Sequence, residues 1–451
     1  MVRHVAHADL FRVTFFSPYI LFDLATFSRL RRSRAEYDAA LEGSKILSSQ
    51  TFRLQLLALF RFSGSIWSPE SLKVRPNLMK STLQRMGRVY GVLRKIHHVR
   101  VIPLFIALFF GLLRLGVWIA MGLDHLFFSK LRSTRPERPI VIVGNPRTGT
   151  TFLQRFLADN GFGAGMELFL MLYPSLLLQA ILKPVLPLLE KLSPAKFHST
   201  EAHHTSLSSV ETDDVGILFR YVDGFFLYGF FLAFEDEDPW PEFAPENRDT
   251  ADRDFAWLSA LWTRSLIKHD AQRNIAKLFS LSVKLPKFLK EFPEAQILYM
   301  ARDPLSVLPS SMSLVIGVLD RAFGFWSLPP EIQKRWLDRM YVGFILLLKR
   351  FHDDWTSGAI DKSRVYVVRY DRMMGEFDTM MDEMCAFLGQ EMTPELKETI
   401  AKKAEKQRAY KSEHKYDLEK FGLSEEKIRA DCAFYYDTFL PPLDKAPAPA
   451  E

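Results

Sequence analysis

RPIVIVGNPRTGTTFLQRFLADNG, residues 138–161, reads as a buried strand, a loop with two glycines and an amphipathic helix. This order is typical of a phosphate-binding loop, because the N–H groups of the loop and of the helix start form a cradle for an anion. Gly144 and Gly149 have the spacing of the glycines in G-x-x-x-x-G-K-[ST], but Thr150 stands in place of the lysine. Arg147 supplies a positive charge from within the loop. We therefore expect the loop to hold a smaller anionic group than a nucleoside triphosphate, without a metal ion.

The rest of the chain from residue 136 alternates short apolar β-branched runs with helical patterns. This alternation predicts an α/β fold, a P-loop-like parallel sheet flanked by helices on both faces. Ligands of such sheets bind at the carboxyl ends of the strands. Strands are predicted at 139–144, 280–286, 295–304 and 364–371. Amphipathic helices are predicted at 150–160, 254–274, 305–317, 331–356, 375–388 and 394–408.

Basic residues are concentrated at the N-terminus. Residues 1–100 hold 17 Lys and Arg against 6 Asp and Glu, a net charge of +11 in a chain whose total is +6. Such a block favours an anionic partner, and the apolar stretch that follows favours a membrane surface over nucleic acid. We predict a basic helical N-terminal region (1–100), an apolar membrane-associated segment with a linker (101–135), a catalytic domain (136–440) and a disordered tail (441–451).

The apolar stretch VIPLFIALFFGLLRLGVWIAMGLDHLFF, residues 101–128, is long enough to reach across a bilayer. Arg114 in its middle and Asp124 near its end are expensive in hydrocarbon, so an interfacial or re-entrant arrangement is an alternative to spanning. A buried helix packed on the catalytic domain is the third interpretation.

The segment 166–234 is too apolar for ordinary surface helices. We interpret it as the walls of a hydrophobic acceptor pocket or as a second membrane-facing surface. Core helices of a large domain are the alternative.

The loop sequence PRTGTT, residues 146–151, resembles the 5′-phosphosulfate loop of sulfotransferases, in the PR[ST]GTT form of the tyrosylprotein and many bacterial enzymes. A second match is YMARDPLSVLPSSMS, residues 299–313. Arg302 and Ser310 there have the separation of the residues that bind the 3′-phosphate of the donor in that family. An arginine fork with a hydroxyl near a helix start can hold a dianionic phosphate.

Two further matches, the second of them looser, extend the resemblance over about residues 138–440. VKLPKFL, residues 283–289, resembles the segment in which these enzymes carry a lysine on a strand, here Lys284. The cytosolic enzymes place a catalytic histidine two residues later, where this chain has Pro286. Residues 413–436 resemble the H-x-Y-x-L-x-x-F-G-L tail that closes over the donor. The resemblance implies 3′-phosphoadenosine 5′-phosphosulfate as donor, bound by Arg147, Thr148, Gly149, Thr150, Thr151, Arg302, Ser310 and Tyr416.

By analogy with phosphoryl transfer, catalysis of sulfuryl transfer needs positioning, charge stabilisation and a general base for the acceptor proton. We expect Arg147 and Lys284 to stabilise the leaving phosphate. Glu167 is the first candidate for the base, because tyrosylprotein-type enzymes place a glutamate at about that distance from the loop arginine. An acidic cluster and a pair of histidines are the alternatives: Glu211, Asp213 and Asp214, and His203 and His204.

These observations predict a sulfotransferase that acts on a hydroxyl or amine of a lipid or other hydrophobic acceptor. A nucleotide-dependent kinase without the usual lysine and a non-enzymatic binding protein are the alternatives. Cys385 and Cys432 form neither a disulfide framework nor a metal motif, so a reducing compartment is expected, and no metal is expected. We expect membrane association, with the catalytic domain on the cytoplasmic side and no nucleic-acid partner. The oligomeric state stays open.

Overall fold

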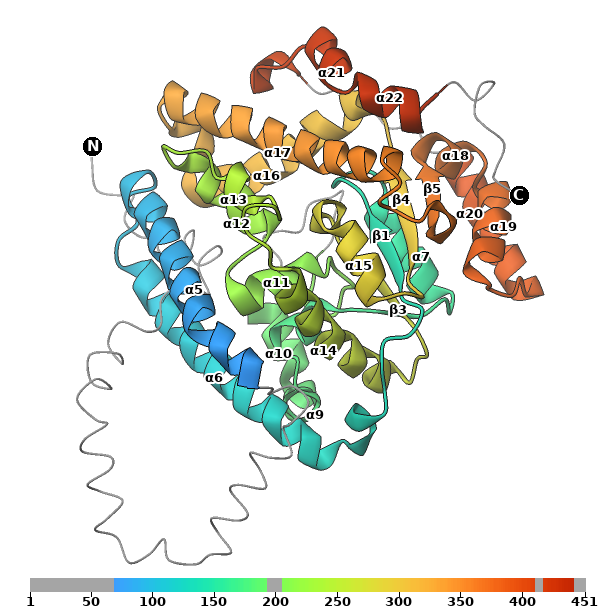
Figure 1. The fold of residues 1–451 in the computed structure, drawn as a ribbon, viewed down its shortest axis with the longest axis horizontal. Helices are drawn as coiled ribbons and strands as arrows, with labels where there is room; N and C mark the ends of the chain where they lie inside the picture. Colours follow the sequence, from blue (N-terminus) through green and yellow to red (C-terminus); the bar gives the residue numbers. More distant parts are fainter. Residues whose placement is uncertain (1–68, 193–204, 410–416, 442–451) are drawn as a thin grey trace, which may run out of the picture. The chain divides into compact units, whose positions relative to one another are not determined.

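The computed structural model describes residues 69–192, 205–409 and 417–441 (Figure 1). These residues divide into two compact units, one up to residue 113 and one from residue 114 on. In the first unit, the described part consists of helix α5 (Pro69–Lys95) and the first half of helix α6 (Ile102–Phe127). The sheet and the candidate site belong to the second unit.

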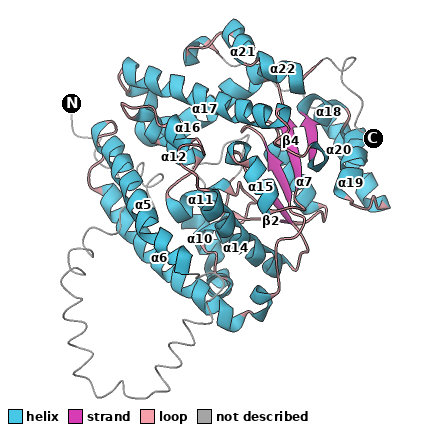
Figure 2. Cartoon of the chain, viewed as in Figure 1, coloured by secondary structure: helices cyan, strands magenta, loops and turns pink. Residues whose placement is uncertain are grey.

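Five parallel strands form one sheet in the order β2-β3-β1-β4-β5, enclosed by helices (Figure 2). Parallel strands need crossover connections, and helices supply them here. The predicted α/β class is therefore confirmed. The strands are β1 (Ile140–Val143), β2 (Ala164–Gly165), β3 (Asn274–Lys277), β4 (Gln296–Ala301) and β5 (Val365–Arg369).

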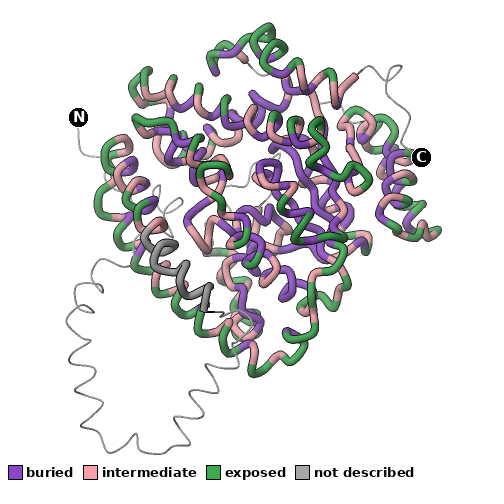
Figure 3. Tube along the Cα trace, viewed as in Figure 1, coloured by how far each residue is buried: buried purple, intermediate pink, exposed green. Residues whose placement is uncertain are grey.

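Helices cover both faces of the sheet because successive side chains of a strand point to opposite sides. Ile140 and Ile142 of β1 belong to a core shared with helices α7 (Thr150–Asp159), α19 (Phe377–Leu388) and α20 (Pro394–Ala409). On the other face, Tyr299 of β4 stacks on Phe351 of α17 (Pro330–Thr356) with ring centroids 3.3 Å apart. Strands β1, β3 and β4 are buried along almost their whole length (Figure 3).

The predicted strand at 280–286 is wrong. Residues Ser280–Val283 form a short 3₁₀ helix, η5, and helix α15 (Leu285–Glu291) follows it; the strand of this region is β3. The segment was predicted as a strand because the alternation S-L-S-V-K-L has the period of a strand. It does not continue β3, because the Asp214 carboxylate accepts the N–H groups of Phe279 and Ser280 and stabilises a turn there. The other three predicted strands and all six predicted helices have counterparts.

The remaining helices connect or flank these elements. They are α8 (Leu168–Leu172), α9 (Leu176–Leu182), α10 (Leu186–Leu192), α11 (Asp214–Tyr221), α12 (Phe225–Phe230), α13 (Trp240–Phe243), α14 (Ala251–His269), α16 (Pro304–Phe323), α18 (Tyr370–Gly375), α21 (Glu425–Asp431) and α22 (Ala433–Phe439). Short 3₁₀ helices include η1 (Ser129–Arg132), η2 (Lys183–Val185), η4 (Leu232–Phe234), η6 (Phe325–Ser327), η7 (Lys362–Arg364) and η8 (Glu419–Phe421).

The apolar segment 166–234 divides between core and surface. Residues 225–234 are largely buried, and Phe225 stacks on Trp240. For these residues the burial supports the alternative of core helices. Three apolar side chains of α9, η2 and α10 are instead exposed: Ile181, Val185 and Leu188.

Helix α6 turns an apolar face to solvent in its second half. Leu115, Trp118, Ile119, Leu123, Leu126 and Phe127 are exposed, about half of Trp118 being accessible. The two charged residues that made spanning costly face the protein. Arg114 donates to the carbonyl oxygen of Arg220, and Asp124 is fully buried. The second half of α6 therefore packs on the protein with one face and exposes the opposite, apolar face to solvent.

Asp124 joins α6 to two other helices. Its carboxylate accepts the Ser175 hydroxyl at 2.7 Å and the N–H groups of Leu176 and Leu177 at 3.1 and 3.0 Å, so it caps α9. It also pairs with Arg264 Nε of α14 at 3.0 Å. Among the described helices, α6 and α16 are long and apolar enough to cross a membrane.

Candidate active site

The loop between β1 and α7 begins and ends on glycines that the fold requires. A Cβ atom on Gly144 would lie 2.9 Å from the carbonyl oxygen of Met300, and one on Gly149 would lie 2.4 Å from Met373 Cε. Gly149 also has φ +94°, a region that side chains disfavour. The two glycines thus let the loop pass close to β4 and α18 at the carboxyl end of the central strand.

Three hydrogen bonds from side chains fix the path of the loop. Thr148 Oγ1 donates to the Asn145 carbonyl oxygen at 2.8 Å, and Asn145 Nδ2 donates to the Phe344 carbonyl oxygen at 3.0 Å. Ser311 Oγ of α16 donates to the Pro146 carbonyl oxygen at 3.0 Å. All of these donors are buried, so the loop is pre-formed rather than shaped by a ligand.

The structure brings together the residues predicted to hold the two ends of the donor. Arg147 Nε donates to Ser310 Oγ at 3.0 Å, and Arg302 Nη1 donates to the Arg147 carbonyl oxygen at 2.6 Å. The Arg302 guanidinium lies 3.8 Å from the ring centroid of Tyr370, a residue that sequence reasoning did not single out. Arg147 has φ +70°, uncommon for a residue with a side chain, and these contacts stabilise it there.

Lys277 supplies a buried cation at this loop. It is the last residue of β3, only 1% of it is exposed, and its Nζ lies 3.0 Å from Thr151 Oγ1. Burial lowers the pKa of Lys277 to about 8, and the nearby Glu211 opposes this shift. Sequence reasoning missed this residue because it placed the strand at 280–286. The sequence signal for this strand was NIAK, residues 274–277, a short run that ends in a lysine shortly before residues 280–286.

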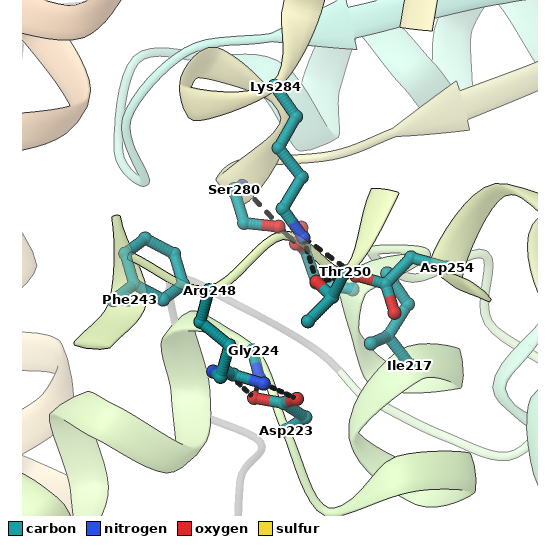
Figure 4. Close-up of a pocket in the computed structure, with 10 residues that line it drawn as sticks. Ile217, Asp223, Gly224, Phe243, Arg248, Thr250, Asp254, Ser280 and Lys284 are labelled. Atoms are coloured by element: carbon teal, nitrogen blue, oxygen red, sulfur yellow. Dashed lines mark hydrogen bonds and ion pairs between the residues drawn. The ribbon is translucent and has the colours of Figure 1, made fainter. Parts of the chain in front are cut away.

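Lys284 lies at the start of α15 instead of on a strand. Its Nζ pairs with Asp254 Oδ2 at 2.7 Å and donates to the Thr250 hydroxyl. These residues line a small pocket, shown in Figure 4. The structure therefore places Lys277 at the loop and Lys284 in the wall of this pocket.

The acidic cluster at the start of α11 forms hydrogen bonds with the end of β3 and with the residues that follow it. Asp213 accepts Trp262 Nε1 at 2.8 Å and the Lys277 N–H at 2.9 Å, and burial raises its pKa to about 7. Burial also raises the pKa of Asp214, which accepts the N–H groups that follow β3. Glu211 accepts Arg155 Nη2 at 3.2 Å. The cluster thus positions the strand that carries Lys277.

Glu167 lies at the N-cap of α8, two residues after the end of β2. Its carboxylate pairs with Lys268 Nζ at 3.1 Å and with His269 Nε2 at 3.2 Å, both from the last turn of α14. Burial acts to raise its pKa, but the hydrogen bond from His269 and the charge of Lys268 outweigh this, so the pKa is lowered. Glu167 is therefore ionised at neutral pH, as a general base must be.

Three of the predicted residues, His203, His204 and Tyr416, lie outside the described residues. The described part of the C-terminal segment reaches the carboxyl end of β4. There Tyr436 of α22 donates a hydrogen bond to Asp303, the residue after Arg302. Within residues 69–192, 205–409 and 417–441, no group of three or more His, Cys, Asp or Glu side chains could hold a metal ion.

A family model described as the sulfotransferase family matches residues 139–394, more than half of the 451-residue chain. The chain belongs to the sulfotransferase family. The matched range of this sulfotransferase begins at β1 and includes the loop, Lys277, Arg302 and Ser310. It does not include α5 or α6.

Two solved structures show the same fold at low sequence identity. Sulfotransferase STF1 from Mycobacterium tuberculosis is 17% identical, with a TM-score of 0.57, and the alignment covers 78% of this chain and 92% of that one. Sulfotransferase STF9 from Mycobacterium avium is 16% identical, with a TM-score of 0.57, covering 81% and 96%. A search of curated proteins found no match.

Proposed function

We propose that this sulfotransferase transfers the sulfuryl group of 3′-phosphoadenosine 5′-phosphosulfate to an acceptor hydroxyl. The single observation that carries the proposal is the meeting of Arg147 with Arg302 and Ser310 at one loop, although 155 and 163 positions separate Arg147 from them along the chain. Two guanidinium groups and a hydroxyl group at one place can bind a dianionic phosphate. The N–H groups of the loop and of the start of α7 lie beside them and can bind the phosphosulfate.

Each part of the site has a role in this reaction. The loop N–H groups, Thr148, Thr150, Thr151 and Arg147 bind the 5′-phosphosulfate, while Arg302 and Ser310 bind the 3′-phosphate. Tyr416 is proposed to close over the donor. Lys277, whose ammonium already touches Thr151, stabilises the leaving phosphate. We assign this role to Lys277 rather than Lys284, which is engaged by Asp254.

The proposed transfer is an in-line displacement at sulfur. A lone pair of the acceptor oxygen forms the new O–S bond while the bond from sulfur to the bridging oxygen breaks. The electron pair of the broken bond leaves on the 5′-phosphate of adenosine 3′,5′-bisphosphate, where Arg147 and Lys277 balance the growing charge. The hydroxyl proton passes to the general base.

The donor proposal is tested against the kinase alternative by thermal unfolding. Adenosine 3′,5′-bisphosphate without magnesium is expected to raise the unfolding temperature, because it binds only the folded state. Adenosine 5′-monophosphate, which lacks the 3′-phosphate, is the matched control and should raise it much less. Stabilisation by ATP with magnesium alone would contradict the proposal.

Glu167 is proposed as the general base. Glu167→Gln keeps the shape of the side chain and removes the proton acceptor, so turnover should fall about 10²-fold or more while donor affinity changes less than about twofold. Steady-state kinetics and calorimetric titration of adenosine 3′,5′-bisphosphate measure the two effects. Unchanged turnover would move the base to the acidic cluster 211–214 or to His204.

We further propose a membrane-associated enzyme with a lipid or hydrophobic acceptor and with its catalytic domain on the cytoplasmic side. Support comes from the exposed apolar face of α6, from exposed Lys130 and Arg132 just after it, and from the basic N-terminal block. An apolar face bordered by basic side chains suits an anionic lipid surface, which the cytoplasmic leaflet provides. Cys385 and Cys432, both free and buried, suit a reducing compartment.

Membrane binding is tested with vesicles of phosphatidylcholine and phosphatidylserine. The double variant Trp118→Ser/Ile119→Ser should lower the bound fraction at least tenfold, because two large apolar side chains leave the docking face. Val342→Ser, an equally exposed apolar side chain of α17, is the matched control and should bind normally. Equal binding of both proteins would show that α6 does not face the lipid.

A further inference from the structure

Two phenylalanines of α12 differ from the rest of their segment. Among residues 225–234, only Phe226 and Phe230 are half-buried, and all the others are buried. The two are four residues apart, so they share one side of the helix. Their rings stack with centroids 6.2 Å apart and planes inclined by 29°. An otherwise buried segment thus keeps part of two aromatic rings accessible.

A chain of ring contacts links this pair to the active site. Phe226 packs edge-to-face on Phe279, with ring centroids 6.1 Å apart. Phe279 lies two residues after Lys277, and its ring centroid is 5.7 Å from Lys277 Nζ. An ammonium at that distance is attracted by the ring face. The aromatic row, defined as Phe279, Phe226 and Phe230, therefore leads from the Lys277 ammonium to partly accessible surface.

The Lys277 ammonium has polar neighbours and this apolar one. Its Nζ lies 3.0 Å from Thr151 Oγ1, on the loop proposed to hold the phosphosulfate. The acidic cluster 211–214 is engaged by the end of β3 and by Arg155. The Phe279 ring belongs to neither group. The aromatic row thus adjoins the proposed donor loop without being part of it.

The reaction brings the acceptor close to the same ammonium. In an in-line displacement the acceptor oxygen approaches the sulfur to about 3–3.5 Å before it reacts. Lys277 is proposed to lie beside the phosphate that leaves from that sulfur. The carbon atoms next to the acceptor hydroxyl must therefore come near the groups that surround the ammonium, and the aromatic row is an apolar part of those surroundings.

Phenyl rings select the kind of acceptor that can lie on them. They offer no hydrogen-bond partner, so a charged or hydroxyl-rich body would lose its bonds to water without replacement. A flat ring system can cover Phe226 and Phe230 together and make the offset contacts that rings prefer. A flexible alkyl chain would have to give up rotational freedom to cover the same surface.

We propose that Phe279, Phe226 and Phe230 form the acceptor subsite, and that the acceptor is an alcohol carried by a flat, uncharged, apolar ring system. The proposal rests on the proposed function and narrows its hydrophobic acceptor to a ring-bearing one. The ring of the acceptor lies on Phe226 and Phe230, and its hydroxyl points along Phe279 toward Lys277.

The first test compares three alcohols with the full-length protein and 3′-phosphoadenosine 5′-phosphosulfate. The probes are 2-naphthylmethanol, 1-undecanol and glycerol. The first two are primary alcohols with the same number of carbon atoms, so they differ mainly in shape. Mass spectrometry of the sulfate esters should give a kcat/KM for 2-naphthylmethanol at least about tenfold above that of the other two. An equal or higher value for either of them, or no sulfation of 2-naphthylmethanol, would overturn the proposal.

Two variants test the residues themselves. Phe226→Ala and Phe230→Ala each remove one half-buried ring, and each should lower kcat/KM for 2-naphthylmethanol at least about tenfold, mainly through KM. Affinity for adenosine 3′,5′-bisphosphate should change less than about twofold.

Phe387→Ala is the matched control for these variants. Phe387 is half-buried as well, packs on Tyr366 and accepts a hydrogen bond from Gln296 at the amino end of β4, the edge of the sheet opposite to the loop. Its loss should leave kcat/KM unchanged. An equal loss of activity in Phe387→Ala would show that the effect is a general one of removing a ring, and it would overturn the assignment of the subsite.

The same measurements keep the two proposals apart. Failure of the unmodified protein to bind adenosine 3′,5′-bisphosphate would contradict the proposed function itself. Normal binding of that nucleotide, together with unchanged kinetics of 2-naphthylmethanol in Phe226→Ala and Phe230→Ala, would contradict only the acceptor subsite.

Discussion

Replacing Lys277 with methionine is expected to lower the rate of sulfuryl transfer by about 10²- to 10³-fold at saturating donor. Methionine has nearly the length of lysine and fills the same buried space without a charge. The leaving phosphate then loses the cation that lies 3.0 Å from Thr151 Oγ1. Glu211 keeps Arg155 as a partner, so the substitution does not leave that carboxylate unpaired.

The matched control for this substitution is Lys284→Met. Both variants remove one lysine that belongs to an ion network, but only Lys277 touches the loop. Single-turnover rates with pre-bound donor should separate them, because such rates report the chemical step rather than donor binding. A larger effect from Lys284→Met would return the role of charge stabilisation to Lys284.

The lowered pKa of Lys277 adds a pH dependence. A lysine with a pKa of about 8 is a cation below that pH and becomes neutral above it, so kcat/KM for the donor should fall as the pH rises through 8. Lys277→Arg, if it folds, should remove this fall because arginine stays protonated. A profile of the unmodified enzyme that stays flat to about pH 9.5 would contradict the assignment.

Replacing Asp124 with leucine is expected to lower the free energy of unfolding by about 3–5 kcal/mol. The Asp124 side chain is fully buried and satisfies the hydroxyl of Ser175, two N–H groups of α9 and the guanidinium of Arg264. Without it, Arg264 is left as a buried cation that lacks its carboxylate. Urea unfolding followed by tryptophan fluorescence measures the change.

Asp270→Asn provides the control for Asp124. Asp270 pairs with Lys130 at 3.4 Å, and both side chains are exposed, so its loss should change the free energy of unfolding by less than about 1 kcal/mol. Asparagine also tolerates the positive φ of this position. Similar stabilities for the two variants would mean that Asp124 does not hold α6, α9 and α14 together.

Local sequence patterns predicted that Arg147, Arg302 and Ser310 would lie near one another, and the structure brings them together. The glycine spacing, Arg147 and the arginine that follows β4 are local features, because each belongs to a turn directly after a strand. The topology of a parallel sheet then brings such turns to one edge, so the contact of Arg147 with Ser310 follows from local patterns.

Lys277 and the polar pocket could not be predicted in this way. Residues 280–286 have a better strand pattern than Asn274–Lys277, and only pairing with β1 and β2 selects the shorter run. The pocket depends on ion pairs between residues 25 to 30 positions apart, such as Arg248 with Asp223. Likewise, Arg114 and Asp124 looked like defects of a membrane helix, because their partners lie in distant helices.

The hydrogen bond from Arg302 to the Arg147 carbonyl oxygen couples the two parts of the site that are proposed to bind the two ends of the donor. The residue proposed to recognise the 3′-phosphate also supports the backbone that recognises the phosphosulfate, and that backbone has an unfavourable φ. Binding energy from the remote phosphate would then be used to align the reacting group rather than only to increase affinity. Adenosine 5′-phosphosulfate, the biosynthetic precursor without that phosphate, would accordingly be rejected at the chemical step even when it occupies the loop.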